Sequence, residues 1–261
     1  HDDNSAESGE NQWYTVGARQ AGKLAGLDYR VEYYHQFGDG AVPATSSQQV
    51  DAYTGTTTNT SDIDRDAYLF GIRVGKTFKN ARFSPTFTLW YDNKSGNDDD
   101  DVNGNDYGAY NTVQDTGHKF YGLLDNYLSD IGDDTQRYGL EDIAIKAKFN
   151  VSEKNVFKVD WHQFLTQTDL EGSDSDTIRA AAGGAFATTA QGTGVLGNDL
   201  GQEIDLTLVH KYDANTKIVT GYSHYFTTLT HSLLNGSGAG DNSNNNTDDQ
   251  SWFYMMIDTT F

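Results

Sequence analysis

The chain has 261 residues, of which 36% are hydrophobic and 13% aromatic, and its formal net charge is −20. No stretch reaches the ~18 consecutive apolar residues that a membrane-spanning helix needs, and the absence of cysteine excludes disulfides, thiolate metal sites and covalent c-type haem. The 27 glycines, the 2 prolines and the many aromatic residues are instead typical of long strands joined by loops.

Apolar and polar residues alternate with a period of two in nine segments, each close to the ~10 residues of a tilted membrane strand. In the seventh segment, Ile204, Leu206 and Leu208 share one face, and Glu203 and Asp205 share the other. A water-soluble sandwich alternates in the same way, so this pattern predicts an all-β fold without placing it in a membrane. The predicted strands are, in chain order, 12–21, 24–37, 66–78, 81–92, 138–151, 155–168, 201–213, 216–229 and 251–261.

The connections between these strands alternate between short and long. The short ones centre on 22–23, 79–80, 152–155 and 213–216, and the long ones are 38–65, 93–137, 169–200 and 230–250. Together with residues 1–11, the long connections hold 26 of the 38 acidic residues and only 5 of the 18 basic ones. Short periplasmic turns with long external loops are the pattern of outer-membrane barrels. We therefore predict that residues 1–261 form one segment of a transmembrane antiparallel β-barrel in the bacterial outer membrane, with acidic extracellular loops.

The last predicted strand carries Phe253, Met255 and Ile257 at alternate positions and ends in Phe261. A terminal aromatic residue on an amphipathic strand resembles the signal that the outer-membrane insertion machinery reads, which places this end in the periplasm. Counting back through the alternating connections then places residues 1–11 outside the cell.

A complete bacterial barrel has an even number of strands with both ends in the periplasm, and no open sheet edge can face lipid. We therefore expect the nine strands to be completed by further strands, either upstream in a longer chain or supplied as a separate fragment. The alternative is one overlooked strand, at 116–128 or at 180–190, which would leave the barrel intact.

Several blocks in the second half of the chain follow one another in a distinctive order and spacing. They are Thr116–Asp125 (TGHKFYGLLD), Gly139–Asp142 (GLED), Val159–Phe164 (VDWHQF), Leu200–Leu206 (LGQEIDL), Gly221–Phe226 (GYSHYF) and the terminal strand. Over roughly 115–261 these blocks resemble the alginate-export family of outer-membrane porins. The resemblance implies a barrel of about 18 strands, of which the nine would be the C-terminal half. It also implies passage of small solutes or, in some members, of an anionic polyuronate through a constriction rich in arginine and lysine.

Acidic and basic residues are balanced on the strand faces that turn away from lipid. The bases are Arg19, Arg30, Arg73, Arg82, Lys146, Lys148, Lys158 and Lys211, and the acids are Asp28, Glu32, Asp92, Asp142, Asp160, Glu203, Asp205 and Asp258. A pore constriction is expected near the middle of the strands. The bases predicted to line it are Arg30, Arg73, Arg82, Lys146 and Lys158, and the acids are Asp142, Asp160, Glu203 and Asp205. An arginine can hold a sugar carboxylate in a bidentate manner, whereas the alternative role of these charges is cross-strand pairing within the barrel wall.

Signs of catalytic chemistry are weak. The seven histidines form no HExxH or HxxxH metal pair, and Ser223 and His224 point to opposite faces of their strand. The acidic run at 97–106 offers oxygen ligands for Ca²⁺, but a solvated loop tip explains it equally. We therefore expect no enzyme activity, no metal site and no cofactor.

The leading functional hypothesis is a porin-type channel for small solutes or anionic saccharides. Its expected surroundings are the lipid bilayer and lipopolysaccharide, and no nucleic-acid partner is expected. A second hypothesis is a structural barrel or sheath that holds a plug, such as a periplasmic or electron-transfer protein. A third is a surface-binding protein that acts through its acidic loops.

Overall fold

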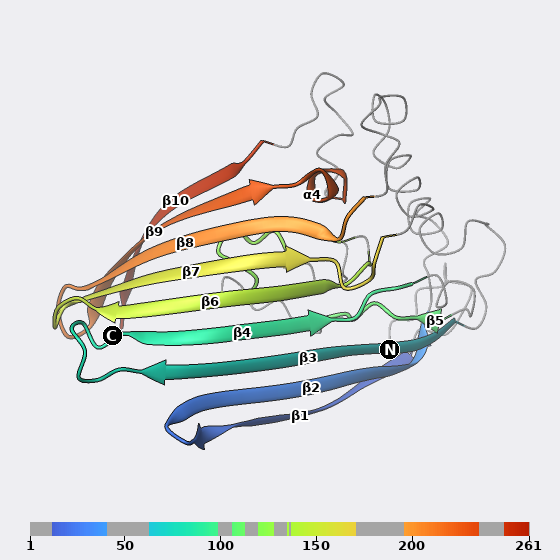
Figure 1. Ribbon diagram of the computed structural model, residues 1–261, viewed down its shortest axis with the longest axis horizontal. Helices are drawn as coiled ribbons and strands as arrows, with labels where there is room; N and C mark the ends of the chain where they lie inside the picture. The colour runs from blue at the N-terminus through green and yellow to red at the C-terminus, as the bar shows by residue number, and fades with distance from the viewer. Residues whose placement is uncertain are drawn as a thin grey trace.

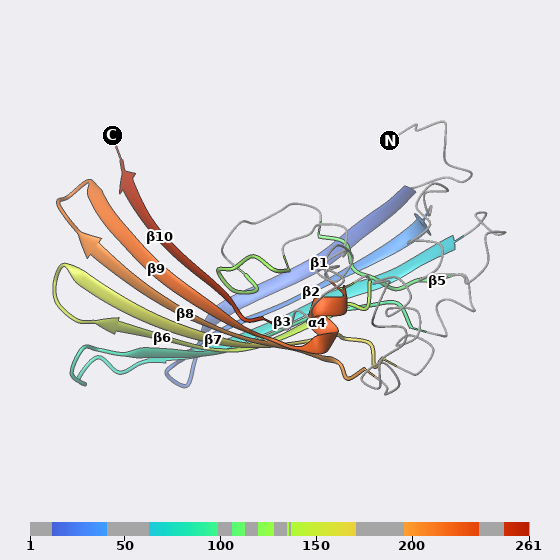
Figure 2. The same ribbon diagram turned by 90° about the horizontal axis from the view of Figure 1, so that it is seen from above.

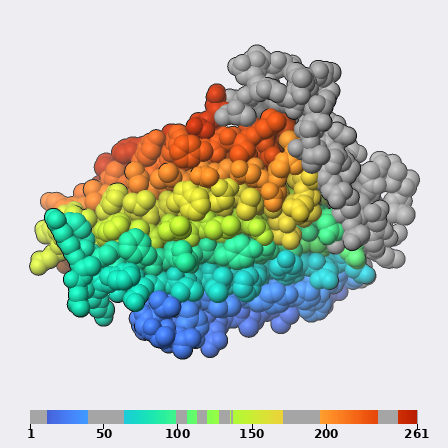
Figure 3. All heavy atoms as spheres, viewed as in Figure 1, coloured from blue at the N-terminus to red at the C-terminus, as the bar shows by residue number. Residues whose placement is uncertain are grey.

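The computed structural model describes residues 12–40, 63–98, 106–112, 120–127, 135, 137–170, 196–234 and 248–260. They form one sheet in which each long strand pairs antiparallel with the next, in the order β1-β2-β3-β4-β6-β7-β8-β9-β10 (Figures 1 and 3). These strands are β1 (Gln12–Leu24), β2 (Leu27–Gly40), β3 (Ile63–Thr77), β4 (Thr86–Lys94), β6 (Leu140–Asn150), β7 (Asn155–Leu165), β8 (Asp199–Lys211), β9 (Thr216–Thr227) and β10 (Gln250–Thr259). A two-residue strand, β5 (Asp106–Tyr107), pairs parallel with β3, and a short helix, α4 (Leu229–Leu234), follows β9. The predicted all-β fold is confirmed.

The described residues contain no helix with the length and apolar character needed to span a bilayer.

All nine predicted segments are strands, and the largest boundary error lies at the start of β4. Sequence alternation places this start too early, inside a hydrogen-bonded turn in which the Phe78 N–H donates to the Pro85 carbonyl at 2.8 Å. Phe83 in this turn has a φ of 67°, a left-handed conformation that does not occur within an extended strand. Arg82 therefore lies in an exposed turn, and its predicted position in the middle of a strand is wrong.

The hairpin between β1 and β2 turns at Ala25 and Gly26, which have φ angles of 51° and 79°. Two consecutive positive φ angles match the right-handed twist of the flanking strands in a two-residue hairpin. The predicted turn at 22–23 instead belongs to β1, which pairs with β2 as far as Leu24.

The two faces of the sheet have the polarity of a membrane barrel. On one face, large apolar side chains are exposed, including Leu89 at 62%, Phe253 at 66% and Met255 at 67%. On the other face, charged and polar side chains are buried, and Asp142 and His162 have no exposed surface. Exposed apolar side chains of this number are unfavourable in water, because burial of apolar surface is the main stabilising term of soluble folds. The apolar face is therefore the lipid-facing face, as the alternation predicts.

The sheet curves into a trough whose polar face is concave (Figure 2). Within the described part of the chain, β1 pairs with β2 alone and β10 pairs with β9 alone. Both edges of the trough are therefore open.

Part of the connection between β4 and β6 lies inside the trough. We call residues 120–127 the internal segment. The ring of Phe120 lies 5.7 Å from that of Trp90 on β4, and the ring of Tyr127 lies 4.7 Å from that of Phe164 on β7. Figure 2 shows this green stretch in the hollow of the sheet.

The internal segment differs from a solvated loop, because the acidity of the whole connection 93–137 conceals a short apolar and aromatic stretch that packs on the sheet. The extracellular position of the rest of this connection stays a prediction. The alternative of a strand at 116–128 is wrong, because the positive φ angles of Tyr121 and Gly122, 60° and 84°, do not allow it.

Most of the other predicted loops lie outside the described residues, as do residues 1–11, the candidate strand at 180–190, and Phe261. The extracellular position of these loops remains a prediction. The described ends of the predicted loop 38–65 belong to the neighbouring strands, since β2 extends to Gly40 and β3 begins at Ile63.

Candidate functional site

The candidate site is a group of charged side chains on the concave face, which strand register places in three adjacent rows. Because side chains alternate between faces, residues paired across neighbouring strands share a face. In one row, Glu32 lies level with Asp92 and Asp142. In the next row, Arg30 lies level with Arg73. In the third row, Lys146 lies level with Asp160 and Asp205. We call this group the charged belt. Its members are Arg30, Glu32, Arg73, Asp92, Asp142, Lys146, Asp160, His162, Glu203 and Asp205.

Arg73 on β3 is the centre of one half of the belt. Its Nη1 donates to Glu32 Oε1 at 2.6 Å, and its Nη2 donates to Asp92 Oδ2 at 2.9 Å and Oδ1 at 3.1 Å. Its guanidinium also lies over the Trp90 ring, 3.5 Å from the centroid. Arg30 Nη2 donates to the second oxygen of Glu32 at 2.5 Å. Both arginines are therefore neutralised by carboxylates: Arg30 by Glu32 of its own strand, and Arg73 by Glu32 and Asp92 of the two neighbouring strands.

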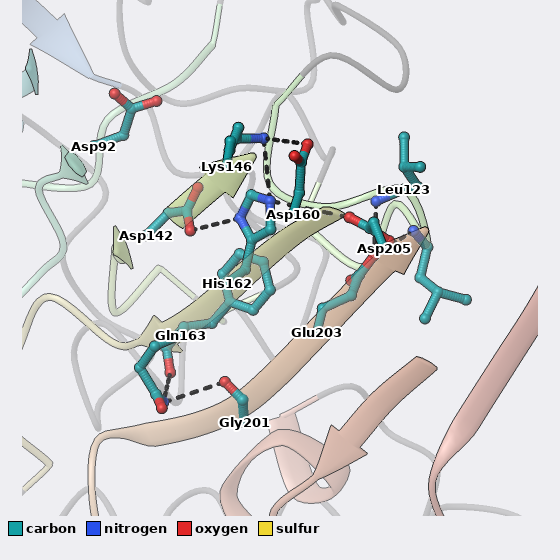
Figure 4. A network of polar contacts seen from close by, with 12 residues as sticks. Asp92, Leu123, Asp142, Lys146, Asp160, His162, Gln163, Gly201, Glu203 and Asp205 are labelled. Atoms are coloured by element: carbon teal, nitrogen blue, oxygen red, sulfur yellow. Dashed lines mark hydrogen bonds and ion pairs between the residues drawn. The ribbon is translucent and has the colours of Figure 1, made fainter. Parts of the chain in front are cut away.

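His162 on β7 is the centre of the other half (Figure 4). Its Nδ1 lies 2.8 Å from Asp142 Oδ1, and its Nε2 lies 3.2 Å from Lys146 Nζ and 4.0 Å from Asp205 Oδ2. Lys146 Nζ is also 3.4 Å from Asp160 Oδ2. These contacts join β6, β7 and β8 side to side, so this half of the belt is a cross-strand network rather than a set of independent charges.

Ser223 extends the network to β9, because its hydroxyl donates to Asp205 Oδ1 at 2.6 Å. The hydroxyl therefore faces a carboxylate and not a histidine. A serine nucleophile needs an adjacent base to take its proton, and the ring nitrogens of His162 contact Asp142 and Lys146 instead. This arrangement does not form the serine–histidine unit of a hydrolase.

Glu203 connects the belt to the internal segment. Its Oε1 accepts hydrogen bonds from the backbone N–H groups of Leu123 and Leu124, at 2.7 and 2.9 Å (Figure 4). Two consecutive backbone N–H groups therefore share one side-chain oxygen of β8 as their acceptor. The internal segment is thus hydrogen-bonded to the wall of the trough at β8.

The far end of the internal segment packs into an aromatic cluster. The Tyr127 hydroxyl lies 2.5 Å from that of Tyr225 on β9 and 2.9 Å from Nδ1 of His231 on α4. The Tyr225 hydroxyl also donates to the Leu200 carbonyl at 2.6 Å. Burial lowers the pKa of His231 to about 4, so its neutral form is the one that this cluster favours. Burial also raises the pKa of Tyr121, which precedes Gly122 in the segment, well above its ordinary value.

Seven of the nine predicted pore-lining residues belong to the charged belt. They are Arg30, Arg73, Asp142, Lys146, Asp160, Glu203 and Asp205. Arg82 lies in the turn between β3 and β4. Lys158 is on the concave face, but it lies near the start of β7, where it is exposed and paired in register with Lys148. Its part in a constriction stays a prediction.

Other parts of the site are missed by sequence reasoning. Glu32 and Asp92 are predicted on the correct face but are not predicted to line the pore. The available signal is their spacing: Glu32 follows Arg30 by two residues, and Asp92 follows Trp90 by two residues, so each pair shares a strand face. The internal segment is missed because a strand-based interpretation treats connections as solvated loops. The apolar run Phe120–Leu124 within an acidic connection is the available signal.

The belt can line a path for ions and polar solutes, but its own charges are largely satisfied by one another. Among the described residues, no group of three or more histidine, aspartate or glutamate side chains is placed to hold a metal ion. Four cations of the concave face are exposed and make no ion pair within the described part of the chain. Arg19 lies on β1, level in register with Glu32, and Lys148, Lys158 and Lys211 lie at the turn end.

Comparison with known proteins finds a family for the sequence. The sequence profile of a family described as "Alginate export" matches residues 1–228. This range includes the first half of the chain, beyond the blocks that carry the resemblance, and stops before β10. No curated protein matches the chain.

Among solved structures, the chain is similar to the "outer-membrane expressed OmpT of Vibrio cholerae", with 11% sequence identity and a TM-score of 0.40. The match covers 85% of this chain and 50% of that one. The chain therefore spans about half the length of the structure that it matches.

Proposed function

The chain belongs to the alginate-export family, and we propose that it forms the charged wall of an outer-membrane channel through which small polar solutes pass. Family membership supports a porin-type or export role in the bacterial outer membrane. The single observation that supports a water-filled path is the inverted polarity of the sheet, with apolar side chains exposed outside and charged ones on the concave face. The proposal is therefore a transport role and not a catalytic one.

The choice of solute rests on which charges are free. Arg30 and Arg73 are already paired with carboxylates, so a sugar carboxylate would have to displace Glu32 or Asp92 to bind them. This favours small polar solutes at the belt. Anionic saccharides remain a second class of cargo, supported by the unpaired lysines Lys148 and Lys158 at the turn end of the concave face.

The open edges of the trough support a larger barrel. The unpaired N–H and C=O groups of β1 and β10 would each cost several kcal/mol in lipid. We propose that further strands complete the cylinder, to about 18 in all, whether they come from the same polypeptide or from a separate fragment.

The test is ion conduction by the full-length protein in planar bilayers. We expect open channels, and we expect Lys148→Glu with Lys158→Glu to shift the reversal potential in a salt gradient towards cation preference, because both lysines face the lumen unpaired. Arg82→Glu is the matched control, since Arg82 is exposed outside the strands and should leave selectivity unchanged. A correctly folded barrel that does not conduct would refute the channel.

A structural sheath is the second candidate. The observation that favours it is that residues 120–127 already occupy part of the trough beside the charged belt and so narrow any path for solutes. A barrel that copurifies with a protein partner and conducts only after that partner is removed would support the sheath in place of the channel.

A further inference from the structure

We infer that Glu203 is the positioning residue that holds the internal segment across the lumen and thereby sets the size limit of the pathway. This inference rests on the proposed channel function. Glu203 is fully buried on β8, and its Oε1 accepts from two consecutive backbone N–H groups, those of Leu123 and Leu124. One side chain of the wall thus fixes the middle of the segment.

The backbone of the internal segment is shaped to receive this carboxylate. Tyr121, Gly122 and Asp125 all have left-handed φ angles, 60°, 84° and 59°. Such residues turn successive N–H groups towards one side and create a concave site for an anion. A Cβ atom on Gly122 would overlap the Glu203 carboxylate, so the segment approaches β8 as closely as a glycine allows. Left-handed conformations at Tyr121 and Asp125 are unfavourable alone and persist where the surroundings hold them.

Aromatic contacts hold both ends of the segment on the concave face. At one end, the Phe120 ring lies 5.7 Å from Trp90 on β4 and 5.2 Å from the Arg73 guanidinium. At the other end, Tyr127 contacts Phe164 on β7 and Tyr225 on β9. The segment therefore crosses the concave face from β4 towards β9, with Glu203 as its central attachment.

Loss of the central attachment should release the middle of the segment without unfolding the sheet. The strands are held by their own backbone ladders from β1 to β10, and none of these hydrogen bonds uses the Glu203 side chain. Removal of the carboxyl group leaves two backbone N–H groups without their acceptor. The population of the docked state relative to the released state should then fall by roughly tenfold or more.

The experiment measures permeation of uncharged sugars of increasing size into liposomes that contain the full-length protein. We expect Glu203→Ala to admit larger sugars than the wild type and to show higher single-channel conductance. Glu203→Gln should have a smaller effect, because its amide oxygen still accepts hydrogen bonds. Gly122→Ala should resemble Glu203→Ala, since it breaks the same contact from the other side. The matched control is Asp28→Asn, a concave-face carboxylate that pairs with Lys23, and it should match the wild type.

A second measurement reports the position of the segment directly. The chain has no cysteine, so Leu123→Cys introduces a single thiol. Its reaction with a membrane-impermeant reagent should be roughly tenfold faster in the Glu203→Ala background.

Each outcome decides a different point. Folding is established by β-sheet circular dichroism and by heat-modifiable migration on gels. Folded Glu203 and Gly122 variants with the size limit and thiol reactivity of the wild type would overturn the inference. If Glu203→Ala does not fold, the same two measurements on Glu203→Gln and Gly122→Ala decide the question. A folded wild-type barrel that admits no sugar and conducts no ions would refute the channel itself.

Discussion

Replacement of Arg73 by methionine should be one of the most destabilising single changes in this chain. Methionine keeps much of the aliphatic stem but removes the charge that faces Glu32 and Asp92. Arg73 makes three charge-assisted hydrogen bonds to these carboxylates, and each such bond contributes ~1.5–3 kcal/mol. Glu32 keeps Arg30 as a partner, so Asp92 bears most of the loss.

The expected loss in the free energy of unfolding is about 3–5 kcal/mol, the range found when one partner of a buried ion pair is removed. Lys217→Met is the matched control, because Lys217 and Asp258 also pair across neighbouring strands but are 48% and 43% exposed. An exposed pair contributes at most about 1 kcal/mol. The double variant Arg73→Met with Asp92→Asn should recover part of the loss, since it leaves no uncompensated charge at Asp92.

The assay is urea unfolding of the protein folded into lipid vesicles, followed by tryptophan fluorescence and by gel migration. A loss below about 1 kcal/mol for Arg73→Met, equal to that of Lys217→Met, would contradict the buried pairing of Arg73. An undiminished loss in the double variant would show that the carboxylate of Asp92 is not the group left unpaired.

Two further predictions concern the lipid-facing surface and the aromatic cluster. Leu89→Lys should destabilise the folded barrel by about 2–4 kcal/mol in the same vesicle assay, because position 89 faces hydrocarbon. The control Thr86→Lys, on the concave face, should be tolerated. Equal losses of stability in the two variants would contradict the assignment of faces. The pKa of His231 is lowered to about 4 by burial, so the native state binds fewer protons than the unfolded state between that value and about 6.5. Its contribution to stability is therefore complete above about pH 6.5 and falls by up to about 3 kcal/mol as the pH approaches 4. His231→Phe should remove that part of the pH dependence of unfolding, and an unchanged pH profile would refute it.

Period-two alternation is sufficient to predict the strands because each face of this sheet meets a different environment. Glu203 and Asp205 face the lumen and Ile204 and Leu206 face lipid, so the sequence of one strand already reveals its orientation. The start of β4 is missed because Phe83 continues the alternating pattern while its backbone turns. Local pattern does not reveal a left-handed φ angle at a residue other than glycine.

The pairing of charges could not be predicted from single strands. Arg30 and Arg73 are correctly predicted on the lumen face, but whether Arg73 is free depends on Glu32 and Asp92, which reach it only through strand register. The internal segment is hidden for a related reason. Its attachment joins Leu123 to Glu203 across 80 residues of sequence, and no periodic signal connects positions so far apart.

The most direct test of the membrane-barrel assignment is a scan of spin labels along β6 in lipid vesicles, one cysteine at a time from Asp142 to Lys146. Oxygen concentrates in hydrocarbon and a polar nickel reagent concentrates in water, so the two collision rates report the environment of each label. We predict high oxygen accessibility at 143 and 145 and low oxygen accessibility at 142, 144 and 146, in strict alternation. Uniform accessibility along the strand, or a nickel preference at 143 and 145, would contradict a sheet that faces lipid with its apolar side and encloses the charged belt.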